Sequence, residues 1–245
     1  MIVIIFFVGL IAGRFTFSKE KQLLEENNKV ILKEPRKIEI NLLAVDDTGK
    51  GVTPKLITQI RPGTGLVLVN INNVLAEVDA QYSARLAKKV AESVSGINLN
   101  ETDVIFDILT SANFIGGQSA GGAMALSLIS LIENKEINQS VMITGAIDEN
   151  GTIHEVGEVY KKSVAAKKAG GLTVLVPLNE SSNLVEYNKI RKCTQMPEGK
   201  FGDVYAGKKY CQTRFEGRKV NLGEEIGIDV IEVKDVKEAM IYYFI

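Results

Sequence analysis

Apolar and polar residues broadly alternate in the first part of the folded region. The segments 37–45 (KIEINLLAV) and 54–61 (PKLITQIR) flank the turn Asp47-Thr-Gly-Lys50. Alternation with a period of two is typical of half-buried strands, so we expect these two segments to pair around the turn. Short apolar runs bounded by Gly, Pro, Asn or Asp predict the other strands, which cover 65–71, 103–109, 140–147, 172–177 and 227–233.

Helical spacing of apolar residues appears between these runs. Small and apolar side chains follow a helical period from residue 80 to 94. The segment 119–132 (SAGGAMALSLISLI) has almost no charge, which predicts a helix buried on all sides. Two further helices are expected at 157–169 and 236–244. The alternation of strands and helices predicts an α/β to α+β fold with mixed sheets and packed helices.

The N-terminal segment has a different character from the rest. Residues 1–17 are apolar except for Arg14, and this length is near the lower limit for a membrane-spanning helix. We therefore expect a retained single-pass transmembrane or signal-anchor helix at 1–17, with a cleaved signal or a buried terminal helix as the alternatives. A charged linker follows at 18–36, and the folded domain occupies 37–245. Within the folded domain, residues 188–219 form a polar, basic insertion that we predict to be a hairpin or a loop.

Composition narrows the possible functions. The chain has 245 residues and a net charge of −1, so it offers no bulk attraction for nucleic acid. One His and two Cys cannot complete a four-ligand zinc site, and we expect neither a metal nor a cofactor. Cys193 and Cys211 would suit a disulfide in an oxidising compartment, whereas the basic residues after the apolar segment would favour the cytoplasm for the domain. The side of the membrane stays open.

A serine lies where a strand and loop give way to the buried helix, in Gly116-Gly-Gln-Ser119-Ala-Gly-Gly122. Glycines on both sides permit a tight turn and close approach of a substrate. Free N–H groups at a helix start could stabilise the oxyanion that forms when an acyl carbonyl is attacked. The alternative is that Ser119 only caps the helix, which is a common role for serine.

A nucleophilic serine needs a base, and two candidates are present. His154, the only His, could form a triad with Asp148 and Ser119. Against this, the turn at 148–151 is enough to account for an Asp at 148. His154 also follows Asp148 too closely for the two residues to come from separate loops. Lys162 lies within an apolar stripe of its helix formed by Val159, Ala166 and Ala169. Burial would lower the pKa of Lys162 and let it accept a proton. The alternative is that its aliphatic stem covers apolar surface while its ammonium stays in water.

The segment 103–177 resembles the proteolytic domain of Lon-type serine proteases. The matching motifs are Gly117-x-Ser119-Ala120-Gly121, then Thr144-Gly145, then Gly157 with Lys162, then the strand LTVLVP at 172–177. The separation of 43 residues from Ser119 to Lys162 equals that of the family. The likeness extends more weakly from residue 37 to the closing strand and helix.

This resemblance implies a serine endopeptidase that acts on protein or peptide substrates. Ser119 would be the nucleophile, Lys162 the base, and Thr144 would hydrogen-bond the lysine, while backbone N–H groups around Gly117, Ala120 and Gly121 would form the oxyanion hole. The family forms rings, commonly hexamers, which implies a homo-oligomer. Gly116, Gln118 and Ala146 depart from residues common in the family, which bears on substrate preference more than on the dyad.

The family usually joins this domain to an ATPase, but the sequence has no G-x-x-x-x-G-K-[ST] phosphate loop. We therefore expect cleavage without an ATPase of its own, or with a separate ATPase partner. Two alternatives remain at this point. One is a catalytically silent, membrane-bound interaction module, and the other is a Ser-His-Asp hydrolase that uses His154.

Overall fold

The computed structural model describes residues 34–70, 75–76, 78–110, 114–115, 118–195 and 209–245. Its larger sheet has the order β1-β4-β7-β5. The strands are β1 (Arg36–Asn41), β4 (Lys55–Pro62), β7 (Thr102–Leu109) and β5 (Val67–Asn70). β4 pairs antiparallel with both β1 and β7, and β5 runs parallel to β7. The mixed α/β class is confirmed.

The expected turn between the first two strands is also present. A short ladder of β2 (Ala44–Val45) and β3 (Gly51–Val52) precedes β4. The Asp46 carboxylate closes its turn by accepting the backbone N–H groups of Thr48 and Lys50. Gly49 has a φ of 79°, a backbone conformation that glycine adopts without steric cost. This small hairpin packs on the helix that carries Lys162 and therefore matters for the site.

The second sheet is parallel and has the order β15-β12-β9. Its strands are β15 (Asp229–Glu232), β12 (Thr173–Val176) and β9 (Val141–Ile143). The single strand expected at 140–147 is wrong, because the chain leaves the sheet after β9 and resumes as β10 (Ala146–Ile147), which pairs with β11 (Ile153–His154). The break leaves Gly145 free to exchange backbone hydrogen bonds with Ser119 and Gly122.

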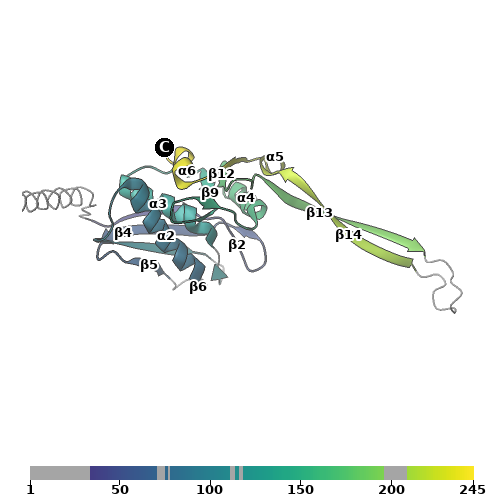
Figure 1. Cartoon of the computed structure of the whole chain (residues 1–245), viewed down its shortest axis with the longest axis horizontal. Coiled ribbons are helices and arrows are strands. Elements are labelled where there is room, and N and C mark those ends of the chain that lie inside the picture. The colour runs from purple at the N-terminus through teal and green to yellow at the C-terminus, as the bar shows by residue number, and fades with distance from the viewer. Residues whose placement is uncertain (1–33, 71–74, 77, 111–113, 116–117, 196–208) are drawn as a thin grey trace, which may run out of the picture.

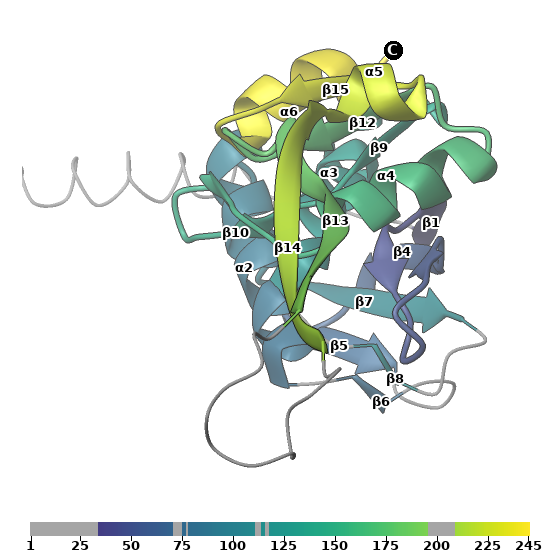
Figure 2. The ribbon, with the colours of Figure 1, turned by 90° about the vertical axis from the view of Figure 1, so that its right-hand side faces the viewer.

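The expected central helix is confirmed as α3 (Gly121–Glu133), in which every residue from Gly121 to Ile132 is buried. It packs on β1 and β4 of the larger sheet, on β9 of the second sheet, and on α2 (Val78–Ser95) and α6 (Val236–Tyr243). Figures 1 and 2 show α3 in the middle of the body, between the two sheets. The core thus holds the start of α3, where Ser119 lies, in a fixed position.

The basic insertion is a β-hairpin, and it is longer than expected. β13 (Ser182–Gln195) pairs antiparallel with β14 (Lys209–Asn221), and Figure 1 shows the two strands extending away from the body. Cys193 and Cys211 are opposite each other in the ladder and form a disulfide. A short helix that the sequence did not predict, α5 (Leu222–Ile226), follows the hairpin.

The expected N-terminal anchor at 1–17 lies outside the described residues, as does the linker up to residue 33. Within the part of the chain that the structure describes, no helix combines the length and the apolar character needed to cross a membrane. The folded domain begins with β1 at Arg36, close to the expected boundary.

Candidate active site

Ser119 lies in a short 3-10 turn, η1 (Gln118–Ala120), directly before α3. We expected it in the first turn of the helix, but the N-cap of α3 is Ala120, and no side chain caps the helix. The capping alternative for Ser119 is therefore wrong. The Ser119 side chain is half-buried and faces a pocket, so its hydroxyl is available for other chemistry.

Backbone contacts hold the serine turn against the break between β9 and β10. The Gly145 N–H donates to the Ser119 carbonyl at 3.0 Å, and the Gly122 N–H donates to the Gly145 carbonyl at 3.1 Å. A Cβ on Gly121 would lie 2.9 Å from Ile147 Cγ1, so a larger residue there would push the two segments apart. The N–H of Gly122 is used in this hydrogen bond and is therefore not free to bind an oxyanion. Gly117, one of the expected donors, lies outside the described residues.

Lys162 lies on α4 (Val159–Lys168), and its side chain is only 5% exposed. Val159 and Ala166, on the same stripe, are fully buried, whereas Ala169 follows the end of the helix and is exposed, contrary to expectation. Burial lowers the pKa of Lys162 from 10.5 to about 8, against the opposing charges of Glu158 and Glu180. A buried ammonium is disfavoured in this way because it loses its hydration. A large fraction of Lys162 is therefore neutral at mildly alkaline pH.

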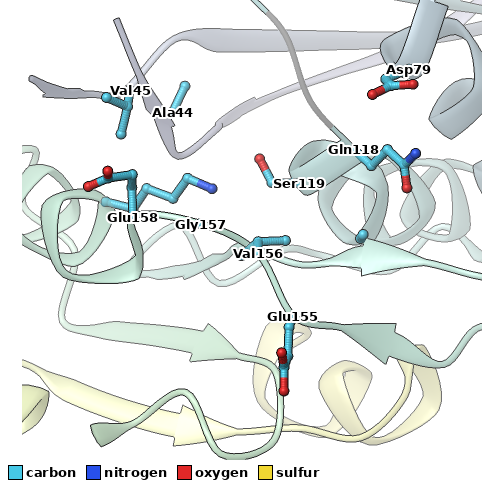
Figure 3. A pocket seen from close by; sticks show the side chains of 11 residues that line it. Ala44, Val45, Asp79, Gln118, Ser119, Glu155, Val156, Gly157 and Glu158 are labelled. Carbon is cyan, nitrogen blue, oxygen red and sulfur yellow. The ribbon is translucent and has the colours of Figure 1, made fainter. Parts of the chain in front are cut away.

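Ser119 and Lys162 line the same pocket, which has a volume of about 410 Å³. Figure 3 shows Ser119 between Gln118 and Asp79 on one side and Glu158 and Val45 on the other. The remaining residues of the wall are Ala44, Ala146, Glu155, Val156 and Gly157. The structure thus brings together the two residues that the sequence proposed as nucleophile and base, from elements 43 residues apart.

Thr144 is fully buried at the break after β9, next to the serine turn. Its backbone N–H donates to the Leu175 carbonyl at 3.0 Å, which ties it to β12. The hydroxyl Oγ1 is buried and makes no hydrogen bond. The expected bond from Thr144 to Lys162 is therefore not formed in this structure. A buried hydroxyl without a partner costs about 1–3 kcal/mol, and such groups call for an explanation.

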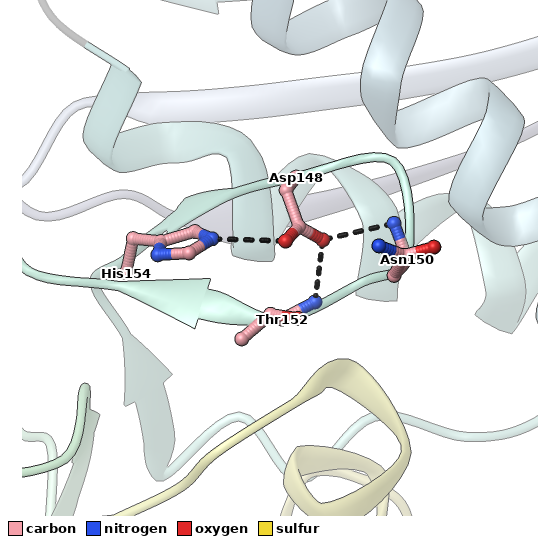
Figure 4. A network of polar contacts seen from close by, with 4 residues as sticks. All are labelled: Asp148, Asn150, Thr152 and His154. Carbon is pink, nitrogen blue, oxygen red and sulfur yellow. Dashed lines mark hydrogen bonds and ion pairs between the residues drawn. The ribbon is translucent and has the colours of Figure 1, made fainter.

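His154 does pair with Asp148, as the alternative triad requires. Figure 4 shows the contact between His154 Nε2 and Asp148 Oδ2, which is 3.0 Å long. Asp148 also accepts the backbone N–H groups of Asn150 and Thr152. Burial raises the pKa of Asp148, but these hydrogen bonds outweigh it and lower the pKa to about 2. His154 is exposed and is not part of the described pocket wall that holds Ser119. The pair therefore stabilises the turn between β10 and β11.

Several residues of the pocket wall were not predicted from the sequence. Ala44 and Val45 reach it from the β2–β3 ladder, more than 70 positions before Ser119, and nothing local marks them. Asp79 comes from the start of α2, where an acidic residue is ordinary. Glu158 could have been found, because a residue four positions before Lys162 lies on the same helix face.

Comparison with known proteins matches more than half of the chain to one family. Residues 51–196 match the family described as Lon protease (S16) C-terminal proteolytic domain. The archaeal Lon protease of Methanocaldococcus jannaschii is 32% identical over 148 residues, covering 56% of this chain and 22% of the relative. The archaeal Lon protease of Thermoplasma acidophilum is 29% identical over 178 residues, covering 67% of this chain and 26% of the relative. The Lon protease of Phenylobacterium zucineum is 33% identical over 120 residues, covering 47% and 15%.

The matched chain spans about a quarter or less of the length of these relatives. The family match itself covers more than half of this chain and includes Ser119, Thr144 and Lys162. The chain belongs to the family of the Lon protease (S16) C-terminal proteolytic domain, a family of peptidases.

Proposed function

We propose that this chain is a serine endopeptidase in which Ser119 is the nucleophile and Lys162 is the general base. The observation that carries the proposal is the shared pocket, which holds a serine at the start of a buried helix and a lysine whose pKa is about 8. A general base works best when its pKa lies near the working pH. An ordinary, hydrated lysine would be protonated and unable to accept the serine proton.

The reaction runs in two halves. Neutral Lys162 Nζ accepts the proton of the Ser119 hydroxyl while Oγ attacks the carbonyl carbon of the peptide bond. The Lys162 ammonium then donates that proton to the leaving amine as the C–N bond breaks, which leaves an ester on Ser119. A water molecule attacks this ester while Lys162 accepts a proton from the water, and the Lys162 ammonium returns that proton to Oγ when the C–O bond breaks.

Two further groups have supporting roles in this proposal. Backbone N–H groups of Ser119 and Ala120 in η1 would stabilise the oxyanion, and Gly121 lets the turn approach Ile147 closely. Gly117, proposed as a further donor from the resemblance, lies outside the described residues. The buried Thr144 hydroxyl has no hydrogen-bond partner, and we propose, from the family resemblance, that it hydrogen-bonds Lys162 when a substrate is bound. Thr144 would then orient the amine toward Ser119.

Substrates and partners follow from the family and the sequence. We propose that the chain cleaves protein or peptide substrates as a homo-oligomer, a hexameric ring by analogy with the family. We further propose that residues 1–17 tether it to a membrane as a single-pass anchor, and that it works without its own ATPase or with a separate ATPase partner. Gln118 and Ala146, which depart from the family pattern, both line the pocket and would affect substrate preference.

The test is cleavage of fluorescently labelled casein by the full-length chain, without ATP and then with it. Ser119→Ala and Lys162→Met should each abolish cleavage, and His154→Ala should retain it because His154 lies outside the pocket wall. Equal cleavage by the wild type and both dyad variants would refute the proposal. Loss of activity in His154→Ala with retention in Lys162→Met would instead establish the Ser-His-Asp hydrolase. A wild type that cleaves no substrate but still binds casein would favour the silent interaction module.

A further inference from the structure

Glu158 occupies an unusual place at the start of α4. It is the N-cap of the helix, and its φ of 62° lies in the left-handed region, which residues other than glycine seldom adopt. Its side chain makes no capping hydrogen bond that would compensate for this conformation. Such strained positions cluster at functional sites, and Glu158 lines the same pocket as Ser119 and Lys162.

The Glu158 carboxylate interacts with two lysines of the first turn, through an ion pair with Lys161 and through its charge with Lys162. Lys161 and Lys162 follow it at i+3 and i+4, the two spacings at which helix side chains are neighbours. The carboxylate pairs with Lys161, with Oε2 and Nζ 2.9 Å apart. Figure 3 shows the Glu158 carboxylate pointing away from Ser119. Lys162, one position further, points into the pocket without this ion pair.

We propose that Lys161 is a positioning residue that holds the Glu158 carboxylate away from Lys162, and thereby keeps Lys162 available as the base that activates Ser119. The proposal rests on the Ser119–Lys162 dyad argued above. A carboxylate in direct contact with Lys162 would stabilise its ammonium and so remove the base. Lys161 prevents this by offering a competing, more exposed cation on the neighbouring face of the helix.

The other charged groups near Lys162 stay the same in every variant of the test. Glu180 acts on Lys162 with the same sign as Glu158, and Asp79 and Glu155 line the pocket. Of the elements packed on α4, β2, β3 and β12 carry no charged residue. The charged residues of α5 are Glu224 and Glu225, and neither lines the pocket. In β13, the charged residues whose side chains are described are Arg191 and Lys192, and neither lines the pocket.

The test is a double-mutant cycle read out as the pH profile of kcat/KM for peptide cleavage by the full-length chain. Lys161→Met frees Glu158 to contact Lys162, so the rising limb should move to higher pH by about 0.7 pH unit, the size expected for unit charges about 4 Å apart in water. At a fixed pH below the limb, this is a loss of about fivefold. Glu158→Gln should move the limb to lower pH.

The combination of Glu158→Gln and Lys161→Met distinguishes the proposal from a simple effect of the Lys161 charge. Without the carboxylate there is nothing for Lys161 to hold, so the double variant should have the profile of Glu158→Gln alone. A direct effect of the Lys161 charge would instead persist, and the limb would again move to higher pH when Lys161 is removed. That second result would overturn the proposal, as would an unchanged limb in Lys161→Met.

Two controls separate this outcome from failure of the dyad or of the fold. Lys168→Met removes the same charge from the exposed end of α4, about 10 Å from Lys161 along the helix axis. It should leave the rising limb of the pH profile in place. Thermal unfolding of each variant checks that the fold is kept. If Ser119→Ala still cleaves the peptide, the dyad itself is wrong. If Ser119→Ala is inactive and the cycle shows no coupling between Glu158 and Lys161, only the positioning role is wrong.

Discussion

Replacing Lys162 by methionine should make the folded chain more stable, by an amount that depends on pH. Lys162 is buried, and its pKa falls from 10.5 to about 8 in the folded state. The unfolded chain therefore binds more protons than the folded chain between these two values. The free energy of unfolding therefore rises as pH increases from 8 to 10.5. Below pH 8 the buried ammonium lowers it by the full amount.

The magnitude follows from the two pKa values. One pKa unit corresponds to 1.36 kcal/mol, so the charged Lys162 costs about 3 kcal/mol at pH 7, about 2 kcal/mol at pH 9 and less than about 0.5 kcal/mol at pH 10.5. Methionine has a similar length and no charge, so Lys162→Met removes this cost. The gain in unfolding free energy should thus shrink by about 3 kcal/mol between pH 7 and pH 10.5.

Urea unfolding of the wild type and Lys162→Met at pH 7, 9 and 10.5 measures this difference directly. Subtracting the two proteins at each pH cancels every other group that titrates in this range. Lys168→Met, which removes an exposed lysine of the same helix, should show no such pH dependence. A stability difference for Lys162→Met that stays constant from pH 7 to pH 10.5 would mean that the amine is hydrated, and the case for Lys162 as a neutral base would fail.

Three other predictions test the site and its support. The kcat/KM of the wild type should rise with pH to a plateau, with its half-maximum near pH 8 and about a tenth of the plateau at pH 7, as a pH series on a fluorogenic peptide would measure. Gly145→Ala should lower the free energy of unfolding measured in urea by about 1–3 kcal/mol, because its Cβ would lie 2.4 Å from Ile153 Cγ2. Gly157→Ala is the control, since its Cβ would have nothing within 4 Å, and it should change the free energy of unfolding by less than about 0.5 kcal/mol. Reduction of the Cys193–Cys211 disulfide should speed proteolytic cleavage of the β13–β14 hairpin and leave the unfolding midpoint of the body unchanged. The reason is that the hairpin extends away from the body, and its main described contacts with the body are those with α4 and α5.

The sequence predicted those parts of the site whose position depends on a local pattern. The uncharged segment 119–132 could only be a buried helix, and α3 is buried from Gly121 to Ile132. The apolar stripe on α4 predicted the burial of Lys162, since neighbours at i−3 and i+4 fix which face meets the core. The strand at 172–177 likewise followed from a continuous apolar run, which is typical of a parallel strand covered on both faces.

Features that depend on contacts distant in sequence were not predictable in the same way. The strand expected at 140–147 is interrupted because Gly145 bonds the Ser119 turn, a contact between segments 26 positions apart (119 to 145). The contribution of Ala44 and Val45 to the pocket depends on how the β2–β3 ladder packs on α4. The left-handed backbone at Glu158 has no signal in the residue type, which favours an ordinary helical conformation.

The site contains two groups that oppose folding, and burial of α3, the helix that follows Ser119, offsets them. The buried Lys162 ammonium costs about 3 kcal/mol at pH 7, and the unpartnered Thr144 hydroxyl costs about 1–3 kcal/mol more. Met124, Leu126, Leu128 and Ile129 of α3 are fully buried. Burial of such side chains stabilises the fold by about 1.5–3 kcal/mol each, which is enough to offset both costs. Because the same burial fixes the start of α3, it keeps Ser119 in the pocket while leaving the polar groups around it unsatisfied and ready for a substrate.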